Sequence, residues 1–226
     1  MRGKFIVLEG MEGVGKTTQL KLLSYRLTKL SIPHYVTSEC TNGPIGKLIR
    51  EEFLSGKQKI DQDALDMLFT ADRIQHIKDE ENGILNKIEN GITVLCDRYY
   101  LSTMAYSDNA FIGDHEKHMN DICVLNKFAM KNMKPDITLC LDIGFTDAMK
   151  NIRKRNNKIE IYDKEETLKK LAISYASSIW YLKKSYNENI EIVDGSDTIE
   201  KVSDKIWNKV YPIIKDIIKE GYNVEQ

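Results

Sequence analysis

Residues 5–17 read Phe-Ile-Val-Leu-Glu-Gly-Met-Glu-Gly-Val-Gly-Lys-Thr, a short apolar run that leads into a glycine-rich loop. From Gly10 onward the stretch matches the pattern G-x-x-x-x-G-K-[ST], which lies between a buried strand and a helix. Glycines at these positions allow backbone conformations that are closed to other residues, and they turn successive N–H groups inward. The following helix adds the positive end of its dipole, which favours an anion. The stretch therefore predicts a site for a nucleoside triphosphate.

The motif predicts specific roles for several residues of the loop. Lys16 is expected to reach the outer phosphates, and the Thr17 hydroxyl is expected to hold Mg²⁺. A carboxylate at Glu12 would repel the triphosphate, so its side chain is expected to face a second ligand such as a sugar hydroxyl; an acid on the loop surface is the alternative. The residues predicted to bind the triphosphate are Gly10, Met11, Glu12, Gly13, Val14, Gly15, Lys16, Thr17 and Thr18.

Outward from this loop, short apolar runs alternate with longer amphipathic segments. The predicted strands are Lys4–Leu8, Tyr35–Ser38, Thr93–Cys96, Ile137–Leu141 and Ile190–Val193. The predicted helical segments are 16–30, 45–54, 63–89, 115–132, 145–155, 164–187 and 198–219. This alternation predicts an α/β fold with a five-stranded parallel sheet covered by helices on both faces. Ligands of such sheets bind beyond the carboxyl ends of the strands.

Length and composition limit the other possibilities. A chain of 226 residues suits one α/β domain, so residues 1–226 are expected to form a single domain. The formal net charge of −1 indicates neither a nucleic-acid surface nor a membrane patch. Four cysteines without C-x-x-C spacing indicate a reducing compartment, and no apolar run approaches the ~18 residues of a membrane span. A cytoplasmic location is therefore expected.

Two further clusters have functional and structural interpretations. Asp97 and Arg98 follow an apolar strand, where an acid can organise Mg²⁺ and an arginine can bind phosphate; a turn or helix cap is the alternative for such an acid. Phe69 and Arg73 share one helix face, so they could stack on a base and bond its edge. A core phenylalanine beside a solvated arginine is the alternative.

Together these segments resemble the thymidylate kinase family. The matching residues are Leu8–Thr18, then Glu39, Gly46–Arg50, Leu68–Arg73, Asp97–Ser107 and Lys134–Asp142, so the resemblance covers nearly the whole chain. The phosphate loop alone does not discriminate among kinases. The runs Asp-Arg-Tyr…Ser-Thr-x-Ala-Tyr and Phe-x-Ala-x-Arg are far more selective.

The resemblance implies an ATP-dependent nucleoside monophosphate kinase with the P-loop NTPase fold, which makes dTDP from dTMP with Mg²⁺ and acts as a homodimer. It places Phe69 on the thymine, Arg73 and Thr103 at its polar groups, Tyr106 under the deoxyribose and Glu12 at the 3′-hydroxyl. Arg98, with Arg50 as a weaker candidate, would hold the acceptor phosphate. Asp97 and Glu39 would organise Mg²⁺ and its waters, and Glu39 belongs to the predicted dTMP site as well.

Family members carry the transition-state arginine either in the phosphate loop or in a lid. Because Gly13 occupies the loop position, the resemblance points to a lid at about residues 150–162, with Arg153 and Arg155 as catalytic candidates beside Lys16 and Arg98. This resembles the bacterial arrangement. The alternatives are a kinase for another deoxynucleoside monophosphate or a nucleoside, and a weakly active nucleotide-binding switch.

Overall fold

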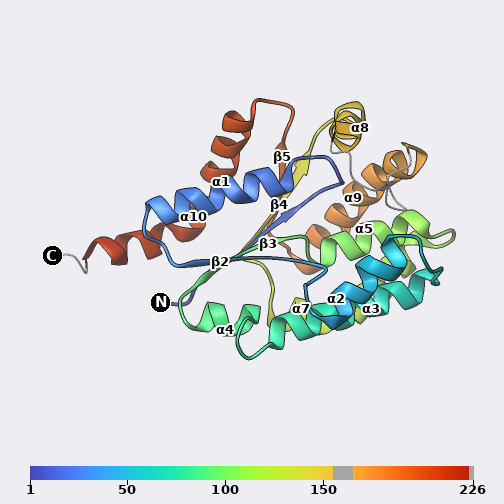
Figure 1. The fold of residues 1–226 in the computed structure, drawn as a ribbon, viewed down its shortest axis with the longest axis horizontal. Helices are drawn as coiled ribbons and strands as arrows, with labels where there is room; N and C mark the ends of the chain where they lie inside the picture. The colour runs from blue at the N-terminus through green and yellow to red at the C-terminus, as the bar shows by residue number, and fades with distance from the viewer. Residues whose placement is uncertain (155–164, 224–226) are drawn as a thin grey trace.

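The computed structural model describes residues 1–154 and 165–223, which are arranged around a five-stranded sheet (Figure 1). The strands are β1 (Phe5–Glu9), β2 (His34–Ser38), β3 (Thr93–Asp97), β4 (Ile137–Asp142) and β5 (Ile190–Asp194). They lie in the order β2-β3-β1-β4-β5, and each neighbouring pair is parallel. The predicted α/β fold with a parallel sheet is confirmed.

The central strand β1 brings the two best sequence motifs to one edge of the sheet. All five of its residues are buried. Leu8 of β1 is in register with Asp97 of β3, and the Arg98 amide donates a hydrogen bond to the Leu8 carbonyl oxygen at 2.9 Å. The phosphate loop and the Asp97–Arg98 pair therefore leave the sheet side by side, at its carboxyl edge.

Helices cover both faces of the sheet. They are α1 (Lys16–Lys29), α2 (Pro44–Leu48), the π-helical η1 (Ile49–Leu54), α3 (Gln62–Lys78), α4 (Ile84–Glu89), α5 (Tyr100–Ala110), α6 (His115–Leu125), α7 (Lys127–Asn132), α8 (Phe145–Lys154), α9 (Glu165–Tyr186) and α10 (Ile199–Asn223). Figure 1 shows α1 and α10 together on one side of the sheet, with α3, α5 and α9 on the other. None of the described helices is both long and apolar enough to cross a membrane.

Two predicted helical segments are each interrupted. The segment 63–89 ends its first helix at Lys78, because the Asp79 carboxylate accepts hydrogen bonds from the amides of Glu81 (3.1 Å) and Asn82 (2.7 Å) and closes a turn. The segment 115–132 is divided at Asn126, whose side-chain amide donates to the Ile122 carbonyl oxygen at 2.9 Å. Side chains that bond the main chain locally thus end both helices.

Helix α5 is absent from the predicted helical segments. Its residues 100–105, 107 and 108 are all buried, so the helix has apolar or buried residues around most of its circumference. Such a helix shows no single apolar stripe in its sequence, and the 3.6-residue periodicity that reveals a surface helix is missing. Helix α5 packs closely against α9. It is therefore enclosed by α9, α6 and α3.

Candidate active site

The phosphate loop joins β1 to α1 in the strand–loop–helix context that the motif requires. Gly10, Gly13 and Gly15 have φ angles of 129°, 80° and 93°, in a region that residues with side chains rarely adopt. The Lys16 Nζ donates hydrogen bonds to the carbonyl oxygens of Gly10 and Met11, both at 2.8 Å. Burial lowers the pKa of Lys16. The loop thus holds an ammonium group at its centre, where the negative charge of a phosphate would complement it.

The remaining loop residues contribute through their main chain or stay at the surface. Met11 and Val14 belong to the buried apolar cluster of the protein, so their side chains do not face a ligand. Thr18 is exposed on the first turn of α1. Of the predicted triphosphate-binding residues in the loop, those with polar side chains in the adjoining cavity are Glu12, Lys16 and Thr17.

Gly13 lies against α8 and has no room for a side chain. A Cβ atom at this position would lie 2.4 Å from the Ala148 carbonyl oxygen, far inside contact distance. The Asn151 side-chain amide also donates a hydrogen bond to the Gly13 carbonyl oxygen at 2.8 Å. An arginine at position 13 is therefore incompatible with this packing, which gives a physical reason for a transition-state cation to come from another segment.

The predicted lid falls mainly outside the described residues, which include only 150–154 of the segment 150–162. Arg153 is exposed on the last turn of α8. Arg155 lies outside the described residues. The catalytic roles of both arginines remain predictions.

Thr17 and Asp97 form a small oxygen-rich group beside the loop. The Thr17 hydroxyl donates a hydrogen bond to Asp97 Oδ2 at 3.2 Å. Asp97 Oδ1 is buried and has no hydrogen-bond partner among the described residues. In the described part of the chain, no three His, Cys, Asp or Glu side chains are grouped so that they could hold a metal alone. This donor set suits Mg²⁺, which usually takes only one or two protein oxygens and completes its shell with water and phosphate.

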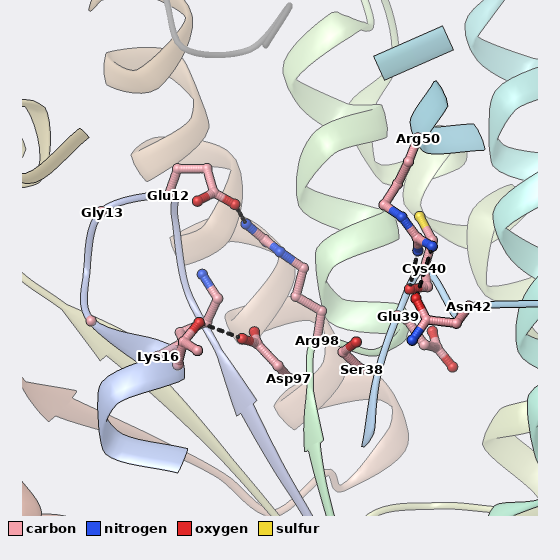
Figure 2. A pocket seen from close by; sticks show the side chains of 12 residues that line it. Glu12, Gly13, Lys16, Ser38, Glu39, Cys40, Asn42, Arg50, Asp97 and Arg98 are labelled. Atoms are coloured by element: carbon pink, nitrogen blue, oxygen red, sulfur yellow. Dashed lines mark hydrogen bonds and ion pairs between the residues drawn. The ribbon is translucent and has the colours of Figure 1, made fainter. Parts of the chain in front are cut away.

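Arg98 occupies the centre of the site (Figure 2). Its backbone has φ 73°, a strained conformation for a residue with a side chain, and such strain concentrates at functional sites. Its Nη2 pairs with Glu12 Oε1 at 2.5 Å, while Nη1 donates to Ser102 Oγ at 3.0 Å and to the Tyr175 hydroxyl at 3.1 Å. Burial opposes the charge, but Tyr106, Tyr175 and Glu12 raise the pKa of Arg98 above its usual range. The guanidinium group is thus a fixed cation between the loop and helix α5.

Arg73 is the most thoroughly buried cation near the site, with 1% of its side chain exposed. Its Nε donates to Glu39 Oε2 at 2.8 Å, and its Nη2 forms an ion pair with the same oxygen at 2.7 Å and donates to Thr103 Oγ1 at 3.0 Å. Nη1 donates to Asn126 Oδ1. The other carboxylate oxygen of Glu39 contacts His76 Nδ1 at 3.1 Å. Both oxygens of Glu39 thus hold Arg73 and His76, and its magnesium role remains a prediction.

An apolar cavity of about 180 Å³ opens beside Arg73. Phe69, Tyr106 and Thr103 line it, together with Arg73 and Arg98. Glu12 lines this cavity as well, so the structure brings together the five residues predicted to contact a nucleobase and its sugar. Their arrangement combines aromatic faces with fixed hydrogen-bond donors, as a flat heterocyclic ligand requires.

Arg50 lies across the cleft from Glu12 in Figure 2. Its Nη1 donates to the carbonyl oxygens of Cys40 and Thr41, both at 2.6 Å, and its Nη2 donates to Asn42 Oδ1 at 3.1 Å. It lines the same cavity of about 280 Å³ as the phosphate loop and Arg98. The Arg50 side chain thus lines the cleft, although all of these hydrogen bonds go to the loop that follows β2.

Five residues of the site were not predicted. Glu9, Ser102 and Tyr175 surround Arg98, and His76 and Asn126 support the Glu39–Arg73 pair. A signal existed for Glu9, because an acid at the last position of an otherwise apolar strand needs buried donors. The other four lie in helical segments or at a helix end, and only the fold shows what they contact.

Comparison with known proteins connects this geometry to a family. The family model described as thymidylate kinase matches residues 8–206. A probable thymidylate kinase of Methanococcus aeolicus is 35% identical over 208 residues, which cover 92% of this chain and 95% of that protein. The thymidylate kinase of Carboxydothermus hydrogenoformans is 31% identical, with 89% and 94% covered.

The comparison with solved structures indicates the same family as the sequence comparison. The thymidylate kinase of Candida albicans, whose published description names a broad substrate specificity and a novel structural element, superposes with a TM-score of 0.72. It is 27% identical, and the match covers 93% of this chain and 92% of that one. The phosphate loop, the buried Arg73 and the central Arg98 thus occur in a chain that belongs to the thymidylate kinase family.

Proposed function

We propose that this enzyme transfers the γ-phosphate of ATP to dTMP, which yields dTDP and ADP. The observation that carries the proposal is the meeting of two cavities at Arg98 and Glu12, one of them beside the phosphate loop and the other beside Phe69. A monophosphate whose base occupies the apolar cavity would place its phosphate group at Arg98. That position adjoins the loop in which the donor phosphates are held.

The apolar cavity suits a thymine base. Phe69 offers an aromatic face for stacking, and the guanidinium of Arg73 is fixed by its bonds to Glu39, Asn126 and Thr103. A carbonyl group of the base would accept from this fixed donor, whereas an amino group in the same place would oppose it. Tyr106 would pack under the deoxyribose.

Glu12 would change partners when the acceptor binds. It now neutralises Arg98 through the 2.5 Å contact with Nη2. The phosphate of dTMP carries more negative charge than a carboxylate and fits the planar guanidinium fork, so it would displace Glu12. The carboxylate would then be available to accept a hydrogen bond from the 3′-hydroxyl. Arg50, on the other side of the cleft, supports the acceptor phosphate at longer range.

The phosphoryl transfer requires that the two phosphates are correctly positioned and that their negative charge is neutralised. The acceptor phosphate is largely ionised at neutral pH, so no side chain has to remove a proton before its oxygen attacks the γ-phosphorus in line. Lys16 and the loop amides would stabilise charge on the donor phosphates, and Arg153 or Arg155 would supply the remaining cation. Thr17 and Asp97 would hold Mg²⁺, which would supply positive charge next to the donor phosphates. The chain's own groups orient the two phosphates toward each other.

We also propose an oligomeric state, a domain organisation and a location for the enzyme. A homodimer rests on the family resemblance, and the exposed apolar side chains of Met67 on α3 and Val124 on α6 would suit such a contact. Light scattering on the purified protein tests it. The buried apolar cluster is shared by strands and helices from both ends of the chain, which supports a single domain. A cytoplasmic location stays a prediction.

An acceptor screen tests the reaction. Purified protein with ATP and Mg²⁺ is supplied in turn with dTMP, dUMP, dCMP, dGMP and thymidine, and ADP release is followed. We expect the highest kcat/KM with dTMP. Release of ADP with another acceptor, and none with dTMP, would contradict the substrate assignment.

A further inference from the structure

The hydroxyl of Tyr175, which has no role in the chemistry above, lies in the interior of the protein next to Arg98. Tyr175 belongs to α9 and is 4% exposed. Its hydroxyl oxygen accepts from Arg98 Nη1 at 3.1 Å, and it lies 3.3 Å from both Glu9 Oε2 and the Gly10 carbonyl oxygen. One atom therefore joins helix α9, the end of β1 and the arginine that faces the acceptor.

Glu9 is one of three acceptors around this hydroxyl, with Ser102 Oγ at 3.0 Å and the Gly10 carbonyl oxygen at 3.3 Å as the others. The carboxylate is fully buried, and its Oε1 accepts from the amides of Tyr99 at 2.7 Å and Ser102 at 3.1 Å. Its Oε2 accepts from the Ser102 hydroxyl at 2.5 Å and from the Tyr175 hydroxyl at 3.3 Å. Since the protons of both hydroxyls point toward acceptors, their lone pairs are left for a donor on the other side.

That donor is Arg98. Its Nη1 donates to three oxygens, on Ser102 (3.0 Å), Tyr175 (3.1 Å) and the Gly10 carbonyl (3.3 Å). Its Nη2 donates to Glu12 in the cleft and to the Tyr106 hydroxyl at 3.2 Å. One nitrogen of the guanidinium group is thus anchored in the interior, and the other is presented to a ligand. Because Arg98 starts from a strained backbone conformation, its direction depends on this anchor.

We propose that Tyr175 is a positioning residue for the acceptor phosphate: with Glu9 and Ser102 it holds Arg98 Nη1, so that Nη2 points at the phosphate of the bound monophosphate. The inference rests on the proposed function, since it assumes that Arg98 binds this phosphate. It predicts that Tyr175 acts on ligands that carry the phosphate and is indifferent to the nucleoside alone.

Replacing Tyr175 by Phe removes the hydroxyl and keeps the ring that packs edge-on against Tyr106, so the core stays filled. Calorimetric titration of the full-length enzyme with dTMP is expected to show affinity lowered roughly tenfold, the size of one lost hydrogen bond to a charged group. Affinity for thymidine, which lacks the phosphate, is expected to change less than about twofold by the same reasoning. In turnover, KM for dTMP rises while KM for ATP is unchanged.

Two comparisons make the test specific. Tyr181→Phe on the same helix, where the ring packs against Tyr186, serves as the matched control and should bind both ligands like the wild type. In an Arg98→Ala background, Tyr175→Phe should have no further effect on dTMP affinity, because the group it positions is gone.

The outcomes distinguish a failure of the Arg98 role from a failure of the Tyr175 role. If Arg98→Ala leaves dTMP affinity unchanged, the proposed role of Arg98 fails. If Arg98→Ala weakens dTMP but Tyr175→Phe does not, or weakens dTMP and thymidine equally, the positioning role of Tyr175 is overturned. Additive losses in the double variant would also overturn it.

Discussion

Replacing Glu39 by Gln tests the buried ion pair that fixes Arg73. The carboxylate lies 2.8 Å from Arg73 Nε and 2.7 Å from Nη2, and the two side chains are 5% and 1% exposed. Glutamine keeps the volume of the side chain and one carbonyl oxygen that can still accept from Arg73. It removes the negative charge that balances the guanidinium group, and it leaves a buried cation with less compensation.

The structure sets the size of the effect. Removing one partner from a buried ion pair costs roughly 3–5 kcal/mol. Because Gln retains one acceptor, we expect the free energy of unfolding to fall by about 2 kcal/mol. A loss of the same size in binding the base would lower kcat/KM for dTMP roughly 30-fold.

The assay combines urea unfolding with steady-state kinetics, in which dTMP and Mg²⁺ are varied separately. Glu52→Gln is the matched control, because Glu52 pairs with Lys57 at 3.4 Å at the surface, where such pairs contribute about 0–1 kcal/mol. We expect Glu39→Gln to raise KM for dTMP and to leave the Mg²⁺ concentration at half-maximal activity unchanged.

The opposite result would refute this reasoning. If Glu39→Gln leaves KM for dTMP at the wild-type value but raises the Mg²⁺ requirement about tenfold, Glu39 organises the metal, as the sequence resemblance implied. Unchanged stability would show in addition that the pair with Arg73 does not contribute to folding.

Three further changes test the loop glycine, the lid arginines and a buried carboxyl group. Gly13→Ala should lower the free energy of unfolding by about 2 kcal/mol or more, measured in urea, because its φ is 80° and its Cβ would meet the Ala148 carbonyl oxygen at 2.4 Å. Arg153→Ala, with Arg155→Ala in parallel, should lower kcat about 100-fold with dTMP affinity unchanged, and wild-type turnover in both variants would rule out the lid assignment. Burial raises the pKa of Asp66 to about 6 from its ordinary 3.8, so the folded state binds the proton more tightly. The stability that this proton contributes is present below about pH 4 and is lost as pH rises through about 6; urea unfolding should therefore show a fall of about 3 kcal/mol that is absent in Asp66→Asn.

Local chemistry explains which parts of the fold could be predicted from the sequence. The strands are short apolar runs, and the loop at Gly10–Thr17 has a spacing that few other structures require, so both were predictable. Helix α5 was not, because a helix buried on most sides has no amphipathic period. The breaks at Asp79 and Asn126 depend on side chains that bond the main chain, which periodicity does not detect.

The residues of the site, too, could be predicted only where a local motif marks them. Phe69, Arg73, Arg98 and Tyr106 belong to short motifs, and their gathering around one cleft agrees with the resemblance. The contacts that Tyr175 makes with distant segments could not be predicted, because they depend on how α9 packs against α5. The bond from Tyr175 to Glu9 spans 166 positions, and nothing local marks the tyrosine.

The transfer of labelled phosphate tests the central claim most directly. The enzyme is incubated with Mg²⁺, dTMP and ATP labelled at the γ-phosphate, and the products are separated. The account predicts that the label appears in dTDP, and that it does so only when dTMP is present. Label found in inorganic phosphate alone, or in dTDP at no more than the rate without enzyme, would contradict it.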